Sequence, residues 1–321
     1  MTVCILGAGA FGTALAIALS ETHDIRLWGR NAEEMTKVET TRKNFKLPGP
    51  ILGAKIKITS DAQTAIQGTD FILSVVPLQP TLTILQSLVG YFEGRPLIGC
   101  SKGLDLTTGQ GGYSVLKASY PNGPIGLLTG PSFAADIARG LPTALTLASE
   151  DSQAVSNWQA QLSNDTLRLY VSHDPIGAEL GAALKNVIAI ACGATIGAGL
   201  GESARAALIT RGQAEIMRYA MQLGARPETL AGLSGFGDLC LTCTSEKSRN
   251  YRYGQALGKG KSFDPSITVE GKATALALVP IMQHLNIDMP ITKAVAGLCS
   301  GTVTVSQALT TLMARPLRRE S

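Results

Sequence analysis

Lys185 is the residue whose neighbours in the sequence most clearly suggest chemistry. It lies in the segment Gly177–Ile196, which reads GAELGAALKNVIAIACGATI and in which Glu179 is the only other charged residue. A helix that is hydrophobic on every side belongs in a protein core. Burial lowers the pKa of a lysine unless a carboxylate compensates, so Lys185 would exchange protons near neutral pH. The alternative is a lysine whose methylene stem carries its charge to the surface.

Three glycines near the N-terminus form a second chemical signal. Gly7, Gly9 and Gly12 follow the apolar run Thr2–Leu6 and precede the small-residue segment Thr13–Ser20. Between a strand and a helix, these glycines allow a tight turn, the approach of a pyrophosphate, and close packing of helix on strand. Free N–H groups at the helix start then meet the phosphates. The pattern predicts dinucleotide binding; a glycine-rich turn that binds nothing is the alternative.

Arg30 bears on which dinucleotide binds. It follows the predicted strand Asp24–Trp28, at a point where NAD-preferring folds carry an acidic residue for the ribose 2′-hydroxyl. Glu33 and Glu34 fall in the next predicted helix. Because an arginine suits a 2′-phosphate, we expect NADP(H) to be preferred, with NAD(H) possible. The alternative is a solvated surface arginine.

Other polar residues follow predicted strands, which continue as Ile56–Thr59, Phe71–Val76, Pro96–Cys100, Ile125–Thr129, Thr143–Ala148 and Leu167–Val171. Lys102 follows the predicted strand Pro96–Cys100, and Gly130 and Ser132 follow the predicted strand that ends at Thr129. Ligands of open parallel sheets bind beyond the carboxyl ends of the strands. We therefore expect these residues to share one site.

The alternation of strands and helices sets the expected architecture. Over residues 1–173 it predicts an α/β, Rossmann-like, doubly wound and mainly parallel sheet. Strand signals then cease, and residues 174–321 predict an all-helical domain whose central helix is capped by Asp174. We expect Ser203 to cap a following helix. The remaining predicted helices and loop are Gln79–Phe92, Ala204–Leu223, Leu233–Gly237 (a glycine-rich loop), Thr274–Leu285 and Thr292–Leu298.

Composition excludes several classes of protein. The chain has 321 residues, 45% of them hydrophobic, and a net charge of +4. That charge is too small, and too scattered, for a nucleic-acid partner. Arg315, Arg318 and Arg319 predict only a short solvated tail. The helical segment could carry the contact face of a homodimer, but sequence does not separate such a face from core.

The same composition argues against a metal, disulfides and a membrane anchor. The six cysteines are scattered, and the CxxC at Cys240 and Cys243 has neither a second pair nor a histidine at ligand spacing. The N-terminus lacks a basic leader, and glycines interrupt its apolar run. No segment has about 20 uninterrupted apolar residues, and Lys185 argues against a spanning helix. We expect a soluble, cytoplasmic protein without a metal.

Ser248, Arg249 and Asn250 could bind a phosphate. They offer a hydroxyl, a planar cation and an amide in succession, which suits a phosphate group. A polar helix start is the alternative.

Motifs along nearly the whole chain resemble the bacterial NAD(P)-dependent glycerol-3-phosphate dehydrogenases. In order they read GAGAFGTALA, SKGL, TGPSFA, ELGAALKNVIAIA, ARAALITRG, GDLCLTCTS, SRN and VEGKATA. The LKN, GDL and SRN segments are specific, whereas the glycine turn occurs in many oxidoreductases. The resemblance implies reversible NAD(P)H-dependent reduction of dihydroxyacetone phosphate to sn-glycerol 3-phosphate, which supplies glycerophospholipid synthesis. It also implies that hydride goes to C2 and that Lys185 is the general acid and base.

The resemblance further implies roles for other residues. Lys102, Asp238 and Thr242 would join Lys185 in catalysis. Substrate would bind Lys102, Gly130, Ser132, Lys185, Asp238, Ser248, Arg249 and Asn250. Cofactor would bind Gly7, Gly9, Ala10, Phe11, Gly12, Arg30, Lys102, Ala134, Arg249, Thr268 and Glu270. The chain departs from the family at Glu202 and Ser203, where Asp-Asn is usual, so a substrate contact of that asparagine does not carry over.

Two other functions are compatible with part of this pattern. A related dehydrogenase acting on a 2-keto or 2-hydroxy acid would need a carboxylate clamp rather than Ser248–Asn250. A non-catalytic sensor of NADP(H) would have no use for a lone lysine in an apolar helix.

Overall fold

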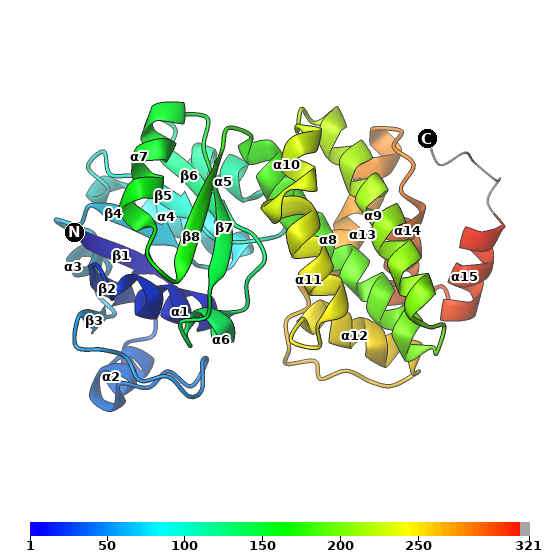
Figure 1. The fold of residues 1–321 in the computed structure, drawn as a ribbon, viewed down its shortest axis with the longest axis horizontal. Coiled ribbons are helices and arrows are strands. Elements are labelled where there is room, and N and C mark those ends of the chain that lie inside the picture. The colour runs from blue at the N-terminus through cyan, green and yellow to red at the C-terminus, as the bar shows by residue number, and fades with distance from the viewer. Residues whose placement is uncertain (315–321) are drawn as a thin grey trace.

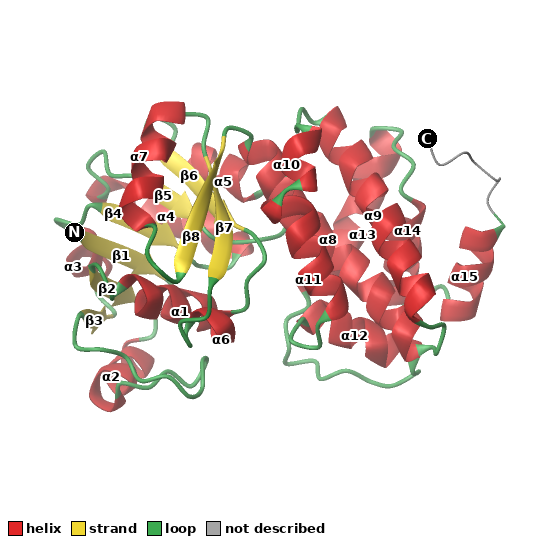
Figure 2. Ribbon diagram, in the orientation of Figure 1, coloured by secondary structure: helices red, strands yellow, loops and turns green. Residues whose placement is uncertain are grey.

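The protein consists of a half that contains all the described strands and a half built of helices. The computed structural model describes residues 1–314; the tail arginines Arg315, Arg318 and Arg319 lie outside the described residues. Figure 1 shows the two halves side by side, and Figure 2 shows the strands confined to one of them. We call residues 1–173 the sheet half and residues 174–314 the helical half.

Eight strands form one sheet in the order β3-β2-β1-β4-β5-β6-β7-β8. Neighbouring strands are parallel except β6 and β7, which are antiparallel. The predicted mainly parallel sheet is therefore confirmed, although the strand expected to reach Val76 ends at Ser74. The strands are β1 (Thr2–Leu6), β2 (Asp24–Trp28), β3 (Ile56–Thr59), β4 (Phe71–Ser74), β5 (Leu97–Gly99), β6 (Ile125–Thr129), β7 (Thr143–Ala148) and β8 (Leu167–Ser172).

Helices cover both faces of the sheet. Successive strand residues point to opposite faces, so Val3 and Ile5 join one apolar cluster while Cys4 and Leu6 join the other. The first cluster is covered by α1 (Ala10–Leu19), α2 (Ala32–Thr41) and α7 (Ser152–Leu162). The second is covered by α3 (Ala62–Ile66), α4 (Leu78–Leu88) and α5 (Gly112–Ser119). The sheet half is doubly wound, as predicted.

The helical half is organised around α8 (Pro175–Gly197), which contains Lys185 and is buried over most of its length. Asp174 caps it as predicted, because its Oδ1 accepts a hydrogen bond from Gly177 N at 2.8 Å. The other helices are α9 (Glu202–Gln222), α10 (Pro227–Ala231), α11 (Asp238–Thr244), α12 (Arg249–Gly258), α13 (Glu270–His284), α14 (Pro290–Ser300) and α15 (Val305–Met313).

Two local predictions are wrong. Ser203 does not cap α9; Gly201 occupies that position with φ of +87°, a conformation that glycine adopts more readily than serine. Leu233–Gly237 is not an open loop but a π-helical turn, in which Gly237 N donates to Gly232 O at 3.0 Å. The π-turn lies against α8, since a Cβ on Gly181 would come 3.0 Å from the Cα of Gly235.

Glycines let α12 approach α8 backbone to backbone. A Cβ on Gly193 of α8 would lie 2.0 Å from the carbonyl oxygen of Tyr251, and one on Gly254 of α12 would lie 2.1 Å from that of Ile190. Larger residues at these positions would separate the helices. The close contact places the N-terminus of α12, with its phosphate-binding candidates, beside the helix that contains Lys185.

By length and composition, α8 could cross a membrane, alone among the helices of residues 1–314. It is not an uninterrupted apolar run of the kind considered in the sequence, because it contains Glu179 and Lys185. Most of α8 is buried inside the helical half, where an all-round apolar surface is the property of a core helix.

Candidate active site

The glycine turn after β1 has the shape that a dinucleotide requires. Gly7 has φ of +124°, and a Cβ there would lie 2.8 Å from the Val75 carbonyl group. A Cβ on Gly12 would lie 2.0 Å from Gly7 O, whereas one on Gly9 would meet no atom within 4 Å. Gly9 is also the N-cap of α1 and offers no side chain to its free N–H groups. The open space above Gly9 fits a pyrophosphate at a helix N-terminus.

A side chain that the sequence analysis missed supports this turn. Asn44 is buried and donates through Nδ2 to Ala8 O at 3.0 Å and to Thr13 Oγ1 at 2.7 Å. Asn44 belongs to the connection between α2 and β3, and no spacing rule links it to the glycines. It fixes the backbone that would face the cofactor.

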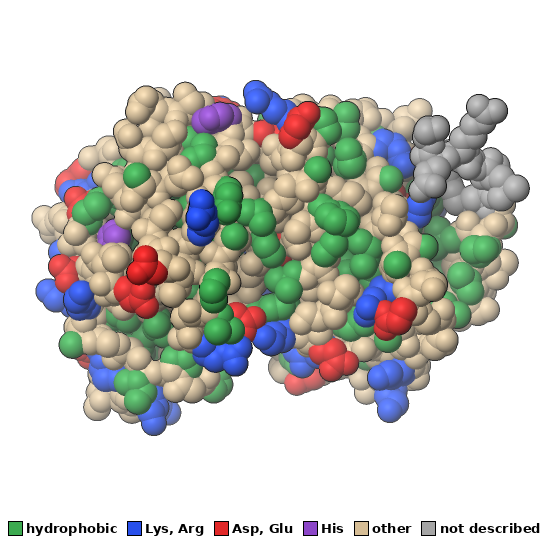
Figure 3. All heavy atoms as spheres, in the orientation of Figure 1, with side chains coloured by type: hydrophobic (Ala, Val, Ile, Leu, Met, Phe, Trp, Pro, Cys, Tyr) green, Lys and Arg blue, Asp and Glu red, His purple; other side chains and the backbone are tan. Residues whose placement is uncertain are grey.

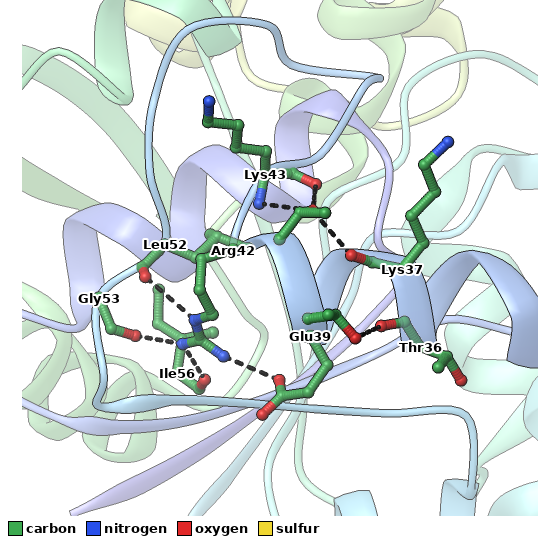
Figure 4. Close-up of polar contacts among 10 residues, drawn as sticks. Thr36, Lys37, Glu39, Arg42, Lys43, Leu52, Gly53 and Ile56 are labelled. Carbon is green, nitrogen blue, oxygen red and sulfur yellow. Dashed lines mark hydrogen bonds and ion pairs between the residues drawn. The ribbon is translucent and has the colours of Figure 1, made fainter.

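Arg42, which directly follows α2, holds the two ends of that connection together (Figure 4). Its guanidinium donates to the carbonyl oxygens of Leu52 at 3.2 Å and Ile56 at 2.7 Å, and also to that of Gly53. An ion pair of 2.8 Å joins it to Glu39. These contacts fix the connection from which Asn44 reaches the turn.

The other predicted cofactor residues are spread over both halves. Arg30 is exposed directly after β2, and Ala10, Phe11 and Ala134 are half-buried at the starts of α1 and α6 (Ala134–Ile137). In the helical half, Arg249 Nη2 and Glu270 Oε1 lie 3.8 Å apart. Thr268 is exposed, and within residues 1–314 no hydrogen bond or ion pair joins it or Arg30 to the other candidates.

Lys185, Asp238 and Lys102 form a connected charge cluster. Lys185 Nζ pairs with Asp238 Oδ1, and Lys102 Nζ lies 2.7 Å from Asp238 Oδ2. The side chains of Lys185 and Asp238 are 6% and 1% exposed. Lys185 is therefore buried and paired, and the surface-lysine alternative is wrong. Lys102, which follows β5, reaches this cluster from the sheet half.

Burial dominates the protonation of Lys185. The pKa of Lys185 is lowered from 10.5 to about 7, and the largest cause is the removal of its ammonium group from water. The carboxylate of Asp238 raises that pKa, and the positive charge of Lys102 lowers it further. Lys185 can thus gain or lose a proton at neutral pH, as a general acid and base must.

Three more candidates surround the cluster. Lys102 Nζ donates to Gly130 O at 3.0 Å, and Ser132 Oγ donates to the same oxygen at 3.2 Å. Thr242 Oγ1 donates to Asp238 O at 2.6 Å, one turn earlier in α11. The structure therefore brings together the ends of β5 and β6 with α8 and α11.

The phosphate-binding candidates begin α12. Ser248 caps the helix, because its Oγ accepts from Tyr251 N at 3.2 Å, so the helix-start interpretation of this residue is confirmed. Asn250 Oδ1 accepts from Gly271 N at 2.9 Å, which leaves Nδ2 as a donor. Arg249 is exposed. Residues 248–250 therefore combine the N-cap of α12 with hydrogen-bond donors that could bind a phosphate.

The two halves also meet at the surface. Lys247 Nζ lies 2.8 Å from Asp136 Oδ1, an ion pair between the start of α12 and α6. Figure 3 shows a notch between the halves at the lower edge of the view, with basic and acidic side chains around it.

No metal centre is evident in residues 1–314, where no three His, Cys, Asp or Glu side chains are grouped to hold an ion. Cys240 and Cys243 are free thiols on α11. Burial raises the pKa of the Cys243 thiol well above its usual range.

Comparison with known proteins identifies the family. Residues 2–155 match the family described as NAD-dependent glycerol-3-phosphate dehydrogenase N-terminus, and residues 174–310 match its C-terminus. The chain is 53% identical over 321 residues to the glycerol-3-phosphate dehydrogenase (NAD(P)+) of Roseobacter denitrificans, covering 100% of both chains. It is 54% identical over 316 residues to that of Cereibacter sphaeroides, covering 98% of this chain and 99% of the relative.

A solved structure agrees with these sequence matches. The crystal structure of glycerol-3-phosphate dehydrogenase from Coxiella burnetii superposes with a TM-score of 0.91 at 33% identity, covering 98% of this chain and 99% of that one. The chain therefore belongs to the NAD(P)-dependent glycerol-3-phosphate dehydrogenase family.

Proposed function

We propose that the protein catalyses the reversible NAD(P)H-dependent reduction of dihydroxyacetone phosphate to sn-glycerol 3-phosphate. We further propose that it does so in the cytoplasm, as a supply for glycerophospholipid synthesis. The sheet half, residues 1–173, would bind the cofactor, and the helical half from residue 174 would supply the acid–base group. Family membership and the buried Lys185–Asp238 pair support this proposal.

The cofactor would lie along the carboxyl edge of the sheet. The glycine turn would bind the pyrophosphate, and Arg30 would favour the 2′-phosphate of NADP(H). Arg249, Thr268 and Glu270 would contact the cofactor from the helical half. Bound NADPH would supply the hydride for C2 of the substrate.

Lys185 would handle the proton. As negative charge grows on the C2 oxygen, the ammonium of Lys185 stabilises that charge and donates a proton from Nζ. In the oxidative direction the neutral amine accepts the proton. Burial is what makes both forms available near pH 7.

Asp238 and Lys102 would place and tune that lysine. Asp238 holds both ammonium groups through its two oxygens, so it fixes the direction in which Lys185 points. Lys102, held also by Gly130 O, would add positive charge beside the substrate. Thr242 and Ser132 would support these contacts.

Ser248, Arg249 and Asn250 would bind the substrate phosphate. A cation and neutral donors that hold this remote group orient the ketone, and orientation accelerates the reaction at C2. A dehydrogenase of unphosphorylated hydroxy acids has no need of this segment.

The observation that carries the proposal is a lysine that is buried and paired with an aspartate where the two halves meet. The test is oxidation of NADPH and NADH by the purified protein with dihydroxyacetone phosphate, compared with a panel of 2-keto acids. Oxidation that depends on dihydroxyacetone phosphate supports the proposal. Turnover of a keto acid alone would replace it with the hydroxy-acid reaction. Cofactor binding without turnover would favour the sensor.

A further inference from the structure

Glu179 is a buried carboxylate outside the cluster around Lys185. It lies on α8 six residues before Lys185, about 9 Å along the helix, and is 5% exposed. Its Oε2 accepts hydrogen bonds from Tyr113 N at 2.7 Å and Ser114 N at 3.2 Å, and its Oε1 accepts from Ser114 Oγ at 3.0 Å. All three donors belong to α5 in the sheet half, so this carboxylate links the two halves.

The start of α5 is shaped to receive this side chain. The N-cap of α5 is Gly111, which has no side chain to accept from the free N–H groups of the first turn. A Cβ at Gly111 would lie 2.3 Å from the Cδ of Glu179. Glu179 thus takes the place of a local cap, and its negative charge faces the positive end of the helix dipole.

Lys102 lies in the segment that leads into α5. Residues 100–111 run from the end of β5 to the N-cap of α5. Gln79 holds the middle of this segment, donating to Leu104 O at 2.9 Å and accepting from Leu106 N at 3.2 Å. Lys102 Nζ then reaches Asp238. The far end of the segment is fixed to α8 by Glu179.

We propose that Glu179 is a positioning residue that holds the Lys102 segment in register with the helix that carries Lys185. One rigid helix then controls both amines: Lys185 directly, and Lys102 through Glu179 and α5. The inference rests on the proposed function, in which Lys102 contacts the substrate. Displacement of the segment would move a substrate-binding cation while leaving the glycine turn in place.

The chain contains a matched control in Glu215. This glutamate of α9 is equally buried and caps α14: its oxygens accept from Ile291 N at 2.6 Å, Thr292 N at 3.1 Å and Thr292 Oγ1 at 3.1 Å. Its chemistry matches that of Glu179, but both of its helices lie in the helical half and neither carries a residue of the proposed site. Loss of a buried cap is therefore separable from loss of the link to Lys102.

The experiment compares Glu179→Ala, Glu179→Gln and Glu215→Ala in the full chain. Glutamine keeps an oxygen for the two N–H groups, and its amide can donate to Ser114 Oγ, so it should restore the link. We expect Glu179→Ala to lower kcat/KM for dihydroxyacetone phosphate about tenfold or more, with KM for NADPH nearly unchanged. Glu179→Gln should recover most of that loss. Glu215→Ala should lower Tm about as much as Glu179→Ala does, while its kcat/KM stays within about twofold of wild type.

Hydrogen exchange gives a second readout that does not depend on turnover. Amides of residues 102–111 should exchange faster in Glu179→Ala and at the wild-type rate in Glu215→Ala. Equal effects of the two alanine variants on kcat/KM, or unchanged exchange in Glu179→Ala, would overturn the inference. If the wild type binds NADPH without reducing dihydroxyacetone phosphate, the proposed function fails, and the exchange rates still decide the role of Glu179.

A milder variant covers the case in which Glu179→Ala does not fold. Ser114→Ala removes only the hydroxyl bond to Oε1. We expect it to lower kcat/KM severalfold and to speed exchange in the same segment, at a small cost in Tm. Suppose that Glu179→Ala does not fold and that Glu179→Gln is fully active. If a folded Ser114→Ala then has wild-type kinetics and wild-type exchange, Glu179 has only a stability role.

Discussion

Lys102 and Asp238 are 136 residues apart in the chain, yet Nζ of the first lies 2.7 Å from Oδ2 of the second. One residue follows a strand of the sheet half, and the other begins α11 in the helical half. The second oxygen of Asp238 pairs with Lys185. Neither half alone therefore contains the cluster that the proposed reaction needs.

Replacement of Lys185 by methionine should lower turnover strongly and preserve the fold. Methionine fills a similar volume, and Asp238 keeps its ion pair with Lys102. We expect kcat to fall by about 100-fold to 10,000-fold, the range for loss of a general acid. Steady-state kinetics, Tm and NADPH binding check this. Lys293→Met, at an exposed position of α14, is the control; a near-normal rate for Lys185→Met would remove Lys185 from the chemistry.

The two directions of the reaction should depend oppositely on pH. Reduction needs the ammonium form of Lys185, so kcat/KM for dihydroxyacetone phosphate should fall as pH rises through about 7. Oxidation needs the amine, so kcat/KM for glycerol 3-phosphate should fall as pH drops through the same region. Loss of the positive charge in Lys102→Gln should move both midpoints to higher pH. Midpoints that stay in place would show that another group titrates.

Arg30 should distinguish the two dinucleotides. Arg30→Ala removes a charge-assisted bond to the 2′-phosphate, so KM for NADPH should rise about tenfold or more. NADH lacks that phosphate, and its KM in the same variant serves as the internal control, expected within about twofold of wild type. Equal changes for both cofactors would make Arg30 the solvated surface residue.

Arg249 should matter only for a phosphorylated substrate. In Arg249→Ala, we expect kcat/KM for dihydroxyacetone phosphate to fall about 100-fold, because orientation through the phosphate is lost. Unphosphorylated dihydroxyacetone, already a poor substrate, should change only severalfold. KM for NADPH measured alongside separates a cofactor contact of Arg249 from a phosphate contact. A parallel loss for both ketones would place the phosphate elsewhere.

Strands were the most predictable part of the fold. A buried parallel strand is a short apolar run, and each run found in the sequence is a strand within two residues of its expected bounds. Helix starts were harder. Ser203 looked like a cap because serine caps many helices, but the backbone turns at Gly201, where φ is positive. The positive φ at Gly201, rather than the capping preference of serine, therefore sets the start of α9.

The site was predictable where local chemistry marks a residue. Lys185 is a lone cation in an apolar helix, and Gly7, Gly9 and Gly12 have a spacing with a physical reason. Long-range pairs left no such mark. Glu179 was visible as a charge in the same helix, but its donors lie 65 and 66 residues away. Asn44 stands in an irregular connection, and only the folded chain brings it to the glycine turn.

Because burial lowers the pKa of Lys185 to about 7, substrate binding should have a calorimetric signature. Near neutral pH the Lys185 amine can therefore gain a proton when its surroundings change. A phosphorylated ligand brings negative charge into the notch between the halves and raises the pKa of this amine. Binding should then draw a fraction of a proton from the buffer, and the observed heat should vary with the buffer's ionisation enthalpy. Substrate binding and protonation of Lys185 would then be thermodynamically linked.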